Sequence, residues 1–317
     1  MNYYAHWVLA AALLVLVSCS RSDSPAIRGD YALKQLTERV YVLHGPNEEP
    51  SKKNQGFMNN PAFVLTSKGV VVIDPGSSLQ VGRMLLARIA KTTPLPVIAV
   101  FNTHIHGDHW LGNQAMHDAY PNAVIYAHQN MLNMAGREGE AWLKIMLSMT
   151  DGATRGTQLV IPNSALENND NLRLGDRHFR VYHTNRAHTD TDLMLEVVED
   201  KLMFLGDVVV AQRAGRLDEG DFKGSIEAID LALASKAVVF VPGHGVSGGR
   251  EIPQAYRSFL STLYASVKKY YAQGLKDFEM KDKVNQDLAA YHSWALYDAG
   301  LGRLVSLAYL QVESESF

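Results

Sequence analysis

The sequence has too few cysteines for a disulfide framework. Cys19 is the only cysteine in 317 residues, so no disulfide bond can form within the chain. Basic runs are also missing, and 30 Lys and Arg against 33 Asp and Glu give a net charge of −3, which does not favour a nucleic-acid partner. Hydrophobic residues make up 47% of the chain, enough to bury a full core in two domains or in one large α/β domain with an appendage.

The apolar run near the N-terminus is too short to cross a bilayer. It covers residues 7–17, the length of a signal-peptide core, and falls short of the roughly 20 residues of a membrane span. The four residues that end at Cys19 read LVSC and resemble the lipobox of bacterial lipoproteins. The resemblance implies that residues 1–18 are a cleaved signal peptide and that Cys19 carries a lipid.

The same resemblance implies a periplasmic protein anchored to the bacterial outer membrane. Ser20, directly after the cysteine, is compatible with sorting to that membrane, and residues 19–35 would form the lipidated N-terminus and tether. Residues 1–6 contain no Lys or Arg, whereas signal peptides begin with positive charge. A soluble periplasmic or secreted protein with an ordinary signal peptide is therefore the alternative.

Hydrophobic patterning beyond the tether predicts a layered α/β protein. Alternating or short buried apolar runs predict strands at residues 40–44, 62–66, 70–73, 97–101, 123–127, 171–182, 193–198, 201–205 and 237–241. Apolar residues at helical spacing predict helices at residues 79–91, 111–119, 131–149 and 222–235 and from 251 onward. This order favours two sheets inside and helices outside. We expect one α/β domain over residues 36–250 and a helical extension over residues 251–317.

The strongest chemical signal is the sequence NTHIHGDH, which ends at His109 and directly follows a predicted buried strand. His104 and His106 are two residues apart, so on an extended segment their imidazoles point the same way and can reach one metal. Gly107 permits a sharp bend, after which Asp108 and His109 can face a second metal. Imidazole and carboxylate ligands suit zinc.

Histidines and an aspartate in this spacing resemble the signature of the metallo-β-lactamase superfamily. Three later residues match the rest of the family's ligand set in order: His188, Asp207 and His244. Each follows or ends a predicted strand, and open α/β sheets place their sites at the carboxyl ends of strands. The resemblance covers roughly residues 40–250. It implies a four-layer αββα sandwich to which the C-terminal helices are an addition.

The family pattern implies two zinc ions, held by His104, His106 and His188, by Asp108, His109 and His244, and by a bridging Asp207. Iron or manganese are the other metals expected. Paired metals lower the pKa of bound water and polarise a carbonyl oxygen. The resemblance therefore implies an enzyme whose metal-bridging hydroxide attacks an ester, thioester, lactone or related carbonyl substrate. Asp108 would orient this nucleophile or move a proton.

The substrate class is less determined. Asp207 stands where true β-lactamases carry Cys or Ser, which disfavours β-lactam hydrolysis as the alternative. A retained Asp is similar to glyoxalase II, lactonases and thioesterases, although the tyrosine-rich, glutathione-binding continuation of glyoxalase II is missing after His244. The nearest likeness is to secreted zinc metallohydrolases found beside bacterial quinoprotein dehydrogenase systems.

Two other classes remain as alternatives. Persulfide dioxygenases resemble this superfamily and use a single iron, for which His104, His188 and Asp207 would be the ligands. A non-catalytic accessory lipoprotein on the same scaffold would be expected to lose ligands, and none is missing from the sequence. The partners expected in every case are a small molecule and, through the lipid, a membrane. The sequence leaves the oligomeric state open.

Two segments are expected to wall the substrate site, residues 46–60 and 131–157, because binding loops are often carried on a rigid scaffold. The second contains four large apolar residues that either form a wall or pack in the core: Met131, Met134, Trp142 and Met146. Arg213, six residues after Asp207, either binds a substrate carboxylate or lies in solvent, and the solvated state is the expected one.

Overall fold

The computed structural model describes residues 26–316, so the predicted signal peptide and Cys19 lie outside the described residues. Its strands are β1 (Leu33–Gln35), β2 (Val40–Leu43), β3 (Ala62–Leu65), β4 (Val70–Ile73), β5 (Val97–Phe101), β6 (Val124–His128), β7 (Ser164–Leu166), β8 (Asn171–Leu174), β9 (Arg177–Tyr182), β10 (Met194–Val197), β11 (Leu202–Val210) and β12 (Val239–His244). Its helices are α1 (Leu79–Thr92), α2 (Gly107–Trp110), α3 (Asn113–Ala119), α4 (Gln129–Met149), α5 (Phe222–Ala234), α6 (Glu251–Tyr271), α7 (Asp277–Asp287), a 3-10 turn (Ala289–Tyr291) and α8 (Tyr297–Ser314). Within residues 26–316, no helix is long and apolar enough to cross a membrane.

The strands form two sheets. The larger has seven strands in the order β1 to β7, antiparallel from β1 to β4 and parallel from β4 to β7. The smaller has five in the order β12-β11-β10-β9-β8, and only β11 and β12 run parallel in it. Because β4 and β5 are parallel neighbours, their carboxyl ends lie side by side, and so do the residues that follow Ile73 and Phe101.

Helices cover the outer faces of the two sheets, whose inner faces share one core. Phe101 of β5 and Phe179 of β9 stack across this core with ring centroids 5.4 Å apart. Apolar residues of α1 and α3 pack on the larger sheet, and those of α5 and α6 pack on the smaller one. The predicted four-layer αββα fold is therefore confirmed.

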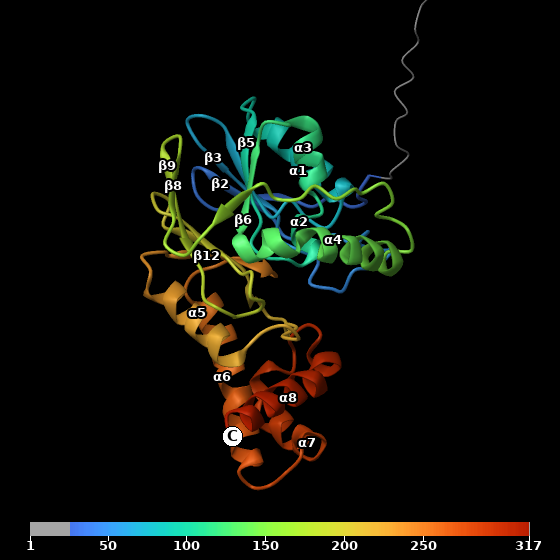
Figure 1. Cartoon of the computed structure of the whole chain (residues 1–317), viewed down its shortest axis with the longest axis vertical. Coiled ribbons are helices and arrows are strands. Elements are labelled where there is room, and N and C mark those ends of the chain that lie inside the picture. Colours follow the sequence, from blue (N-terminus) through green and yellow to red (C-terminus); the bar gives the residue numbers. More distant parts are fainter. Residues whose placement is uncertain (1–25, 317) are drawn as a thin grey trace, which may run out of the picture.

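The C-terminal helices extend the layer that covers the smaller sheet. Leu263 of α6, Val284 of α7 and Leu304 of α8 belong to one buried cluster that also contains Ile229 of α5 and Leu205 of β11. Figure 1 shows α6, α7 and α8 gathered at the end of the molecule opposite to α1 and α3. The extension thus shares its core with the α/β layers.

Two predicted elements differ from the structure near the metal-binding motif. The predicted helix over residues 111–119 is wrong at its start, since α2 already begins at Gly107 and α3 follows after a break. The strand predicted to end at Leu205 continues as β11, so Asp207 lies inside a strand and not at its end. Gly206 has φ +51°, and the pairing of β11 with β12 shifts register on both sides of it. This bulge re-aims the following side chain.

Smaller differences occur away from the site. The β-rich stretch over residues 171–182 is a hairpin, β8 and β9, that turns at Gly175 with φ +64°. Strands β1 and β7, of three residues each, were not predicted. Both lie at the edges of the larger sheet, where short strands leave little periodicity in the sequence.

Candidate metal centre and substrate pocket

The predicted metal-binding motif is shaped by contacts of its own residues. It leaves β5 in an extended form and enters helix α2 at Gly107. Trp110 is fully buried and donates from Nε1 to the carbonyl oxygen of Ile105 at 2.7 Å, which closes the turn. A Cβ at Gly107 would lie 2.6 Å from Cβ of Trp142, so this close approach requires glycine.

The other predicted ligands reach the motif from the smaller sheet. They are His188 in the loop between β9 and β10, Asp207 within β11, and His244 at the end of β12. Two hydrogen bonds fasten the β9–β10 loop to the motif: Ile105 N donates to Thr191 Oγ1 at 3.0 Å, and Leu193 N donates to Thr103 O at 2.7 Å. The structure therefore brings all seven predicted ligands to one place.

His104, His106 and His188 form the first group. One nitrogen of each lies within 4.8 Å of the others. Nε2 of His188 lies 2.9 Å from Nδ1 of His106, and the rings of His104 and His188 stand edge to face with centroids 5.1 Å apart. Three converging imidazole nitrogens are a donor set that suits zinc.

Asp108, His109 and His244 form the second group, which shares no member with the first. Oδ2 of Asp108 lies 3.2 Å from Nε2 of His244 and 3.5 Å from Nε2 of His109. The two Nε2 atoms are 3.4 Å apart. This group offers one carboxylate oxygen and two imidazole nitrogens.

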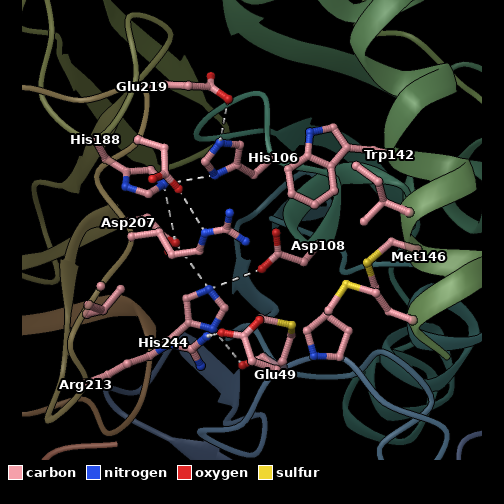
Figure 2. A pocket seen from close by; sticks show the side chains of 18 of the residues that line it. Glu49, His106, Asp108, Trp142, Met146, His188, Asp207, Arg213, Glu219 and His244 are labelled. Atoms are coloured by element: carbon pink, nitrogen blue, oxygen red, sulfur yellow. Dashed lines mark hydrogen bonds and ion pairs between the residues drawn. The ribbon is translucent and has the colours of Figure 1, made fainter. Parts of the chain in front are cut away.

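Asp207 lies between the two groups. Its Oδ1 is 3.2 Å from Nε2 of His109, and its Oδ2 is 3.2 Å from Nε2 of His244 and 3.7 Å from Nε2 of His188. Figure 2 shows its carboxylate facing His188 and His244. A Cβ at Gly243 would lie 1.9 Å from Oδ1 of Asp207, so glycine at this position leaves room for the carboxylate. A carboxylate that reaches both groups is placed as a bridging ligand would be.

Buried atoms without partners test whether a metal fits. Nε2 of His104 and Oδ1 of Asp207 are buried and have no hydrogen-bond partner among the described residues. Oδ1 of Asp207 does approach His109, but the contact lacks the alignment of a hydrogen bond. Leaving buried polar atoms unsatisfied costs free energy, and a cation between the groups would satisfy both. The donor set fits a divalent metal of the zinc type.

The protonation states of the first group suit metal binding. Burial, followed by the neighbouring His109, lowers the pKa of His104 well below its usual value. Burial, followed by His106, lowers the pKa of His188 to about 4. Both imidazoles are therefore neutral at pH 7, which is the form that binds metal.

The second group is an ion-paired cluster. Burial lowers the pKa of His109, but the carboxylates of Asp207, Asp108 and Asp74 outweigh burial and raise that pKa well above its usual value. Burial raises the pKa of Asp108, but His109 and a hydrogen bond from His244 outweigh it and hold that pKa below its usual range. A metal that binds here would replace protons on the imidazoles, so binding would release protons.

Asp74 is a functional residue that the sequence analysis missed. Its Oδ2 lies 2.8 Å from Nδ1 of His109. Thr103 donates to Asp74 from its backbone N at 2.8 Å and from its hydroxyl at 2.7 Å, and the same hydroxyl lies 3.1 Å from Nδ1 of His104. One buried carboxylate thus orients a histidine of each group. The available signal was an Asp directly after a buried strand, at the edge where the motif begins.

Two further histidines also have a partner on the ring nitrogen that faces away from the cluster. Nδ1 of His244 lies 2.9 Å from the carbonyl oxygen of Met58, in the loop predicted to wall the site. Nε2 of His106 lies 3.7 Å from Oε1 of Glu219, which the sequence analysis also missed. A hydrogen-bonded partner such as that of His244 fixes the ring orientation and tautomer of a metal-binding histidine, whereas the contact of His106 is longer than a hydrogen bond.

A cavity of about 320 Å³ opens onto the cluster. Helix α4 contributes an apolar wall to it, made of Trp142, Ile145, Met146 and Met149. Figure 2 shows Trp142 and Met146 on one side of the cluster and Arg213 on the opposite side. Of the four apolar residues predicted as wall or core, Trp142 and Met146 line the cavity, whereas Met131 packs in the core.

Arg213 is not solvated, which corrects the expectation from the sequence. Its side chain is only 6% exposed, and Nη2 lies 3.1 Å from Oε1 of Glu49. Nη1 donates to Asn47 Oδ1 at 3.4 Å and to the carbonyl oxygen of Glu48 at 3.2 Å. The guanidinium is thus fully engaged by the loop that precedes β3.

Comparison with known sequences agrees with the motif. Residues 55–244, more than half of the chain, match the sequence model of the metallo-beta-lactamase superfamily. The chain is 25% identical over 197 residues to a probable metallo-hydrolase of Streptococcus pyogenes, covering 59% of this chain and 79% of that protein. It is 28% identical over 167 residues to a hydroxyacylglutathione hydrolase of Gloeobacter violaceus, covering 51% of this chain and 54% of that protein. The chain therefore spans about half the length of that second relative.

Solved structures show the same fold. A metallo-beta-lactamase from Pontibacter korlensis superposes with a TM-score of 0.60 at 19% identity, covering 73% of this chain and 99% of that one. A sec-alkylsulfatase from Pseudomonas sp. superposes with a TM-score of 0.69 at 17% identity, covering 89% of this chain and 50% of that one. The predicted class, a metal-dependent hydrolase of this superfamily, is confirmed at that level.

Proposed function

Because the chain belongs to the metallo-β-lactamase superfamily, we propose that it is a dinuclear zinc hydrolase that cleaves an ester, thioester, lactone or related carbonyl substrate. The observation that carries the proposal is the position of Asp207. Its two carboxylate oxygens contact two ligand groups that share no residue. A third possible group, of His104, His109 and Asp207, takes one residue from each, and two donor groups joined by one carboxylate are what a two-metal site requires.

The residues assign a role to each part of the site. His104, His106 and His188 would hold one zinc ion, Asp108, His109 and His244 the other, and Asp207 would bridge them. Bound metals would supply Lewis acidity and lower the pKa of water, which no side chain of the pocket can do as well.

Asp108 is the residue we assign to proton transfer. It lines the cavity. Burial raises the pKa of its carboxyl group, but His109 and the hydrogen bond from His244 outweigh burial and hold that pKa below the usual range, so the carboxylate is ionised. An ionised oxygen facing the cavity can orient a water molecule and accept its proton, and can later return that proton to the leaving group. Asp74 would keep His109 in place during this step.

The cavity favours substrates with an apolar part. Trp142 and Met146 of α4 line the same cavity as the ligand cluster. Among the relatives named here, one is called a hydroxyacylglutathione hydrolase and one a metallo-beta-lactamase, so thioester and β-lactam substrates both belong in the test. We place β-lactams second, because Asp207 occupies the bridging position.

Metal content and a substrate panel test the proposal. About two zinc ions per purified chain are expected, with hydrolysis of at least one of S-lactoylglutathione, p-nitrophenyl acetate, a homoserine lactone and nitrocefin. Asp108→Ala and His106→Ala should abolish that hydrolysis, while the matched changes Asp118→Ala and His117→Ala on the surface of α3 should not. Full activity in both site variants would refute the metal mechanism. One tightly held iron per chain would favour a persulfide dioxygenase, and oxygen uptake with a persulfide would then be measured.

We also propose that a lipid on Cys19 anchors the enzyme to the outer membrane on its periplasmic side. The proposal rests on the sequence LVSC at Cys19, because the described residues begin at Ala26. Cys19→Ser should move the protein from the membrane fraction to the soluble periplasmic fraction. Unchanged fractionation of the variant would reject the anchor.

A further inference from the structure

The substrate cavity does not end at the ligand cluster. A second cavity, of about 240 Å³, shares four lining residues with the first: Glu49, Gly215, Arg216 and Arg303. Arg303 lies on α8, in the C-terminal helical extension. The two cavities are therefore adjacent and have these residues as a common wall, and we call the pair the groove.

Helix α8 forms much of the wall of the second cavity. The start and body of the helix contribute mainly apolar lining residues: Leu296, Ala299, Gly300, Leu304 and Leu307. The segment ahead of α8 is hydrogen-bonded to the residues that follow β11, since Ala214 N donates to Ala295 O and Ala295 N donates to Gln212 O, each at 2.9 Å. These bonds hold α8 in a defined position beside Arg216.

Three arginines line the groove, and their contacts differ. Arg213 is buried and engaged by Glu49. Arg216 and Arg303 instead share Asp218: Nε of Arg216 lies 3.0 Å from Oδ2, and Nε of Arg303 contacts Oδ1. Both contacts use Nε. The Nη groups of these two guanidiniums have no hydrogen-bond partner among residues 26–316.

Apart from the predicted ligands, three arginines and three acidic residues line the groove, so any positive excess in it is local. Glu49 is paired with Arg213, and Glu219 faces His106. Asp218, by contrast, is one negative charge between two guanidiniums, so that trio carries a net charge of +1. The guanidinium pair lines both cavities, with each side chain 60% exposed, so a ligand in the groove can reach it. The planar fork of a guanidinium matches a carboxylate.

We propose that Arg216 and Arg303 bind a carboxylate of the substrate and make the enzyme selective for anionic esters or thioesters. This inference rests on the proposed hydrolytic function and adds the chemical class of its substrate. The scissile carbonyl would lie at the ligand cluster, the apolar part of the substrate on Trp142 and Met146, and the carboxylate where the two cavities meet. Helix α8 is then part of the substrate site.

Matched esters of increasing length test the proposal. The substrates are p-nitrophenyl monoesters of succinate, glutarate, adipate and suberate, each compared with the same ester whose free carboxylate is a carboxamide. At the length that spans the groove, the wild type should prefer the carboxylate about tenfold in kcat/KM, the size expected of one charge-assisted hydrogen bond. Arg216→Gln and Arg303→Gln should each lower this ratio, mainly through KM.

Two further variants separate carboxylate binding from a packing role. Asp218→Asn removes the anion that competes for both guanidiniums, so the preference for the carboxylate ester should rise above that of the wild type. Arg257→Gln is the matched control, because Arg257 of α6 pairs with Asp230 and does not line the groove. The proposal would be overturned if the ratio of kcat/KM for the carboxylate ester to that for the carboxamide ester were the same, at every length, in the wild type, Arg216→Gln and Arg303→Gln.

Binding distinguishes this proposal from the proposed function. Calorimetric titration of the zinc-loaded enzyme compares each dicarboxylate of the series with the monocarboxylate of equal length, such as suberate with octanoate. The wild type should bind one dicarboxylate about tenfold more tightly than its partner, and Arg303→Gln should reduce this difference. Equal affinities in the wild type reject the carboxylate site even if esters are cleaved. Preference for the dicarboxylate without cleavage of any ester rejects the hydrolase and supports the site.

Discussion

Asp74→Asn should weaken both metal sites through a single buried side chain. Asp74 is 4% exposed and accepts hydrogen bonds from Thr103 N and Thr103 Oγ1, and its Oδ2 lies 2.8 Å from Nδ1 of His109. Asparagine has the same shape but presents one acceptor and one donor. If its oxygen keeps the bond to Thr103 N, its NH₂ group faces the nitrogen of His109, which then loses its acceptor.

The effect reaches the first group through Thr103. When the Thr103 hydroxyl donates to Asp74, its oxygen can accept a hydrogen bond from a protonated Nδ1 of His104, 3.1 Å away. That tautomer leaves Nε2 of His104, the buried atom without a partner, free to bind metal. An amide in place of the carboxylate makes the hydroxyl reverse its role, which disfavours this tautomer of His104.

The magnitude follows from the loss of such orienting partners. Removing one typically lowers metal affinity about 10–100-fold, so the midpoint of zinc removal by a chelator should move by that factor in Asp74→Asn. Thr103→Val should weaken only the ion held by the first group, because the contact of Asp74 with His109 remains. Unfolding of metal-free Asp74→Asn in urea should require about 1–3 kcal/mol less than the wild type, the cost of an unsatisfied buried group.

The assay is chelator competition followed by kinetics with added zinc. Saturating zinc should restore most of the lost kcat/KM in Asp74→Asn, because the residue acts through ligand orientation. Asp230→Asn is the matched control, since Asp230 is an exposed residue of α5 that pairs with Arg257 of α6 and lines neither cavity. Unchanged chelator resistance, or an activity loss that zinc does not repair, would refute the reasoning.

Three further outcomes are expected from separate parts of the structure. Gly243→Ala should lose bound zinc and lower kcat/KM about 100-fold, because the added Cβ would lie 1.9 Å from the Asp207 carboxylate. Gly136→Ala is the control and should keep both zinc and activity, because the nearest atom to its added Cβ lies 3.9 Å away. Trp142→Ala should raise KM about tenfold for esters with long apolar acyl groups and less for acetate esters, measured in one kinetic series. Burial, and then Lys34, lowers the pKa of His44 from 6.5 to about 4, so its folded pKa lies below the unfolded value. The free energy of unfolding therefore keeps its full value above pH 6.5 and falls as the pH is lowered toward 4. The expected loss is about 1–2 kcal/mol, because the side chain is partly exposed. Urea unfolding of the metal-free proteins should show a smaller loss in His44→Gln than in the wild type.

The seven ligand positions could be predicted because their information is local. The motif that ends at His109 compresses four ligand-type residues into six positions behind a buried strand. The remaining ligands follow or end apolar runs that are readable as strands, and the structure brings them to the same cluster. That the cluster holds two zinc ions remains a prediction.

Residues that orient the ligands could not be predicted in the same way. Asp74 reaches His109 only because β4 and β5 pair in parallel, and no pattern in the sequence states which strands are neighbours. The bulge at Gly206 depends on the register of β11 against β12, which is also a long-range property. The sequence therefore predicts what can bind a metal more readily than what holds the binding residues in place.

Helix α8 shows the same limit at the level of function. It lies in the helical extension predicted from residue 251 onward, but a helical pattern does not indicate what the polar face of the helix contacts. Arg303 contacts Asp218, 85 residues earlier in the chain, and thereby enters the wall of the substrate groove. An arginine on an exposed helix face is ordinarily solvated, and its placement beside Arg216 depends on how the extension packs on the smaller sheet. The shared core of the extension and the α/β layers therefore places Arg303 where, under our proposal, it would contact a substrate held at the ligand cluster.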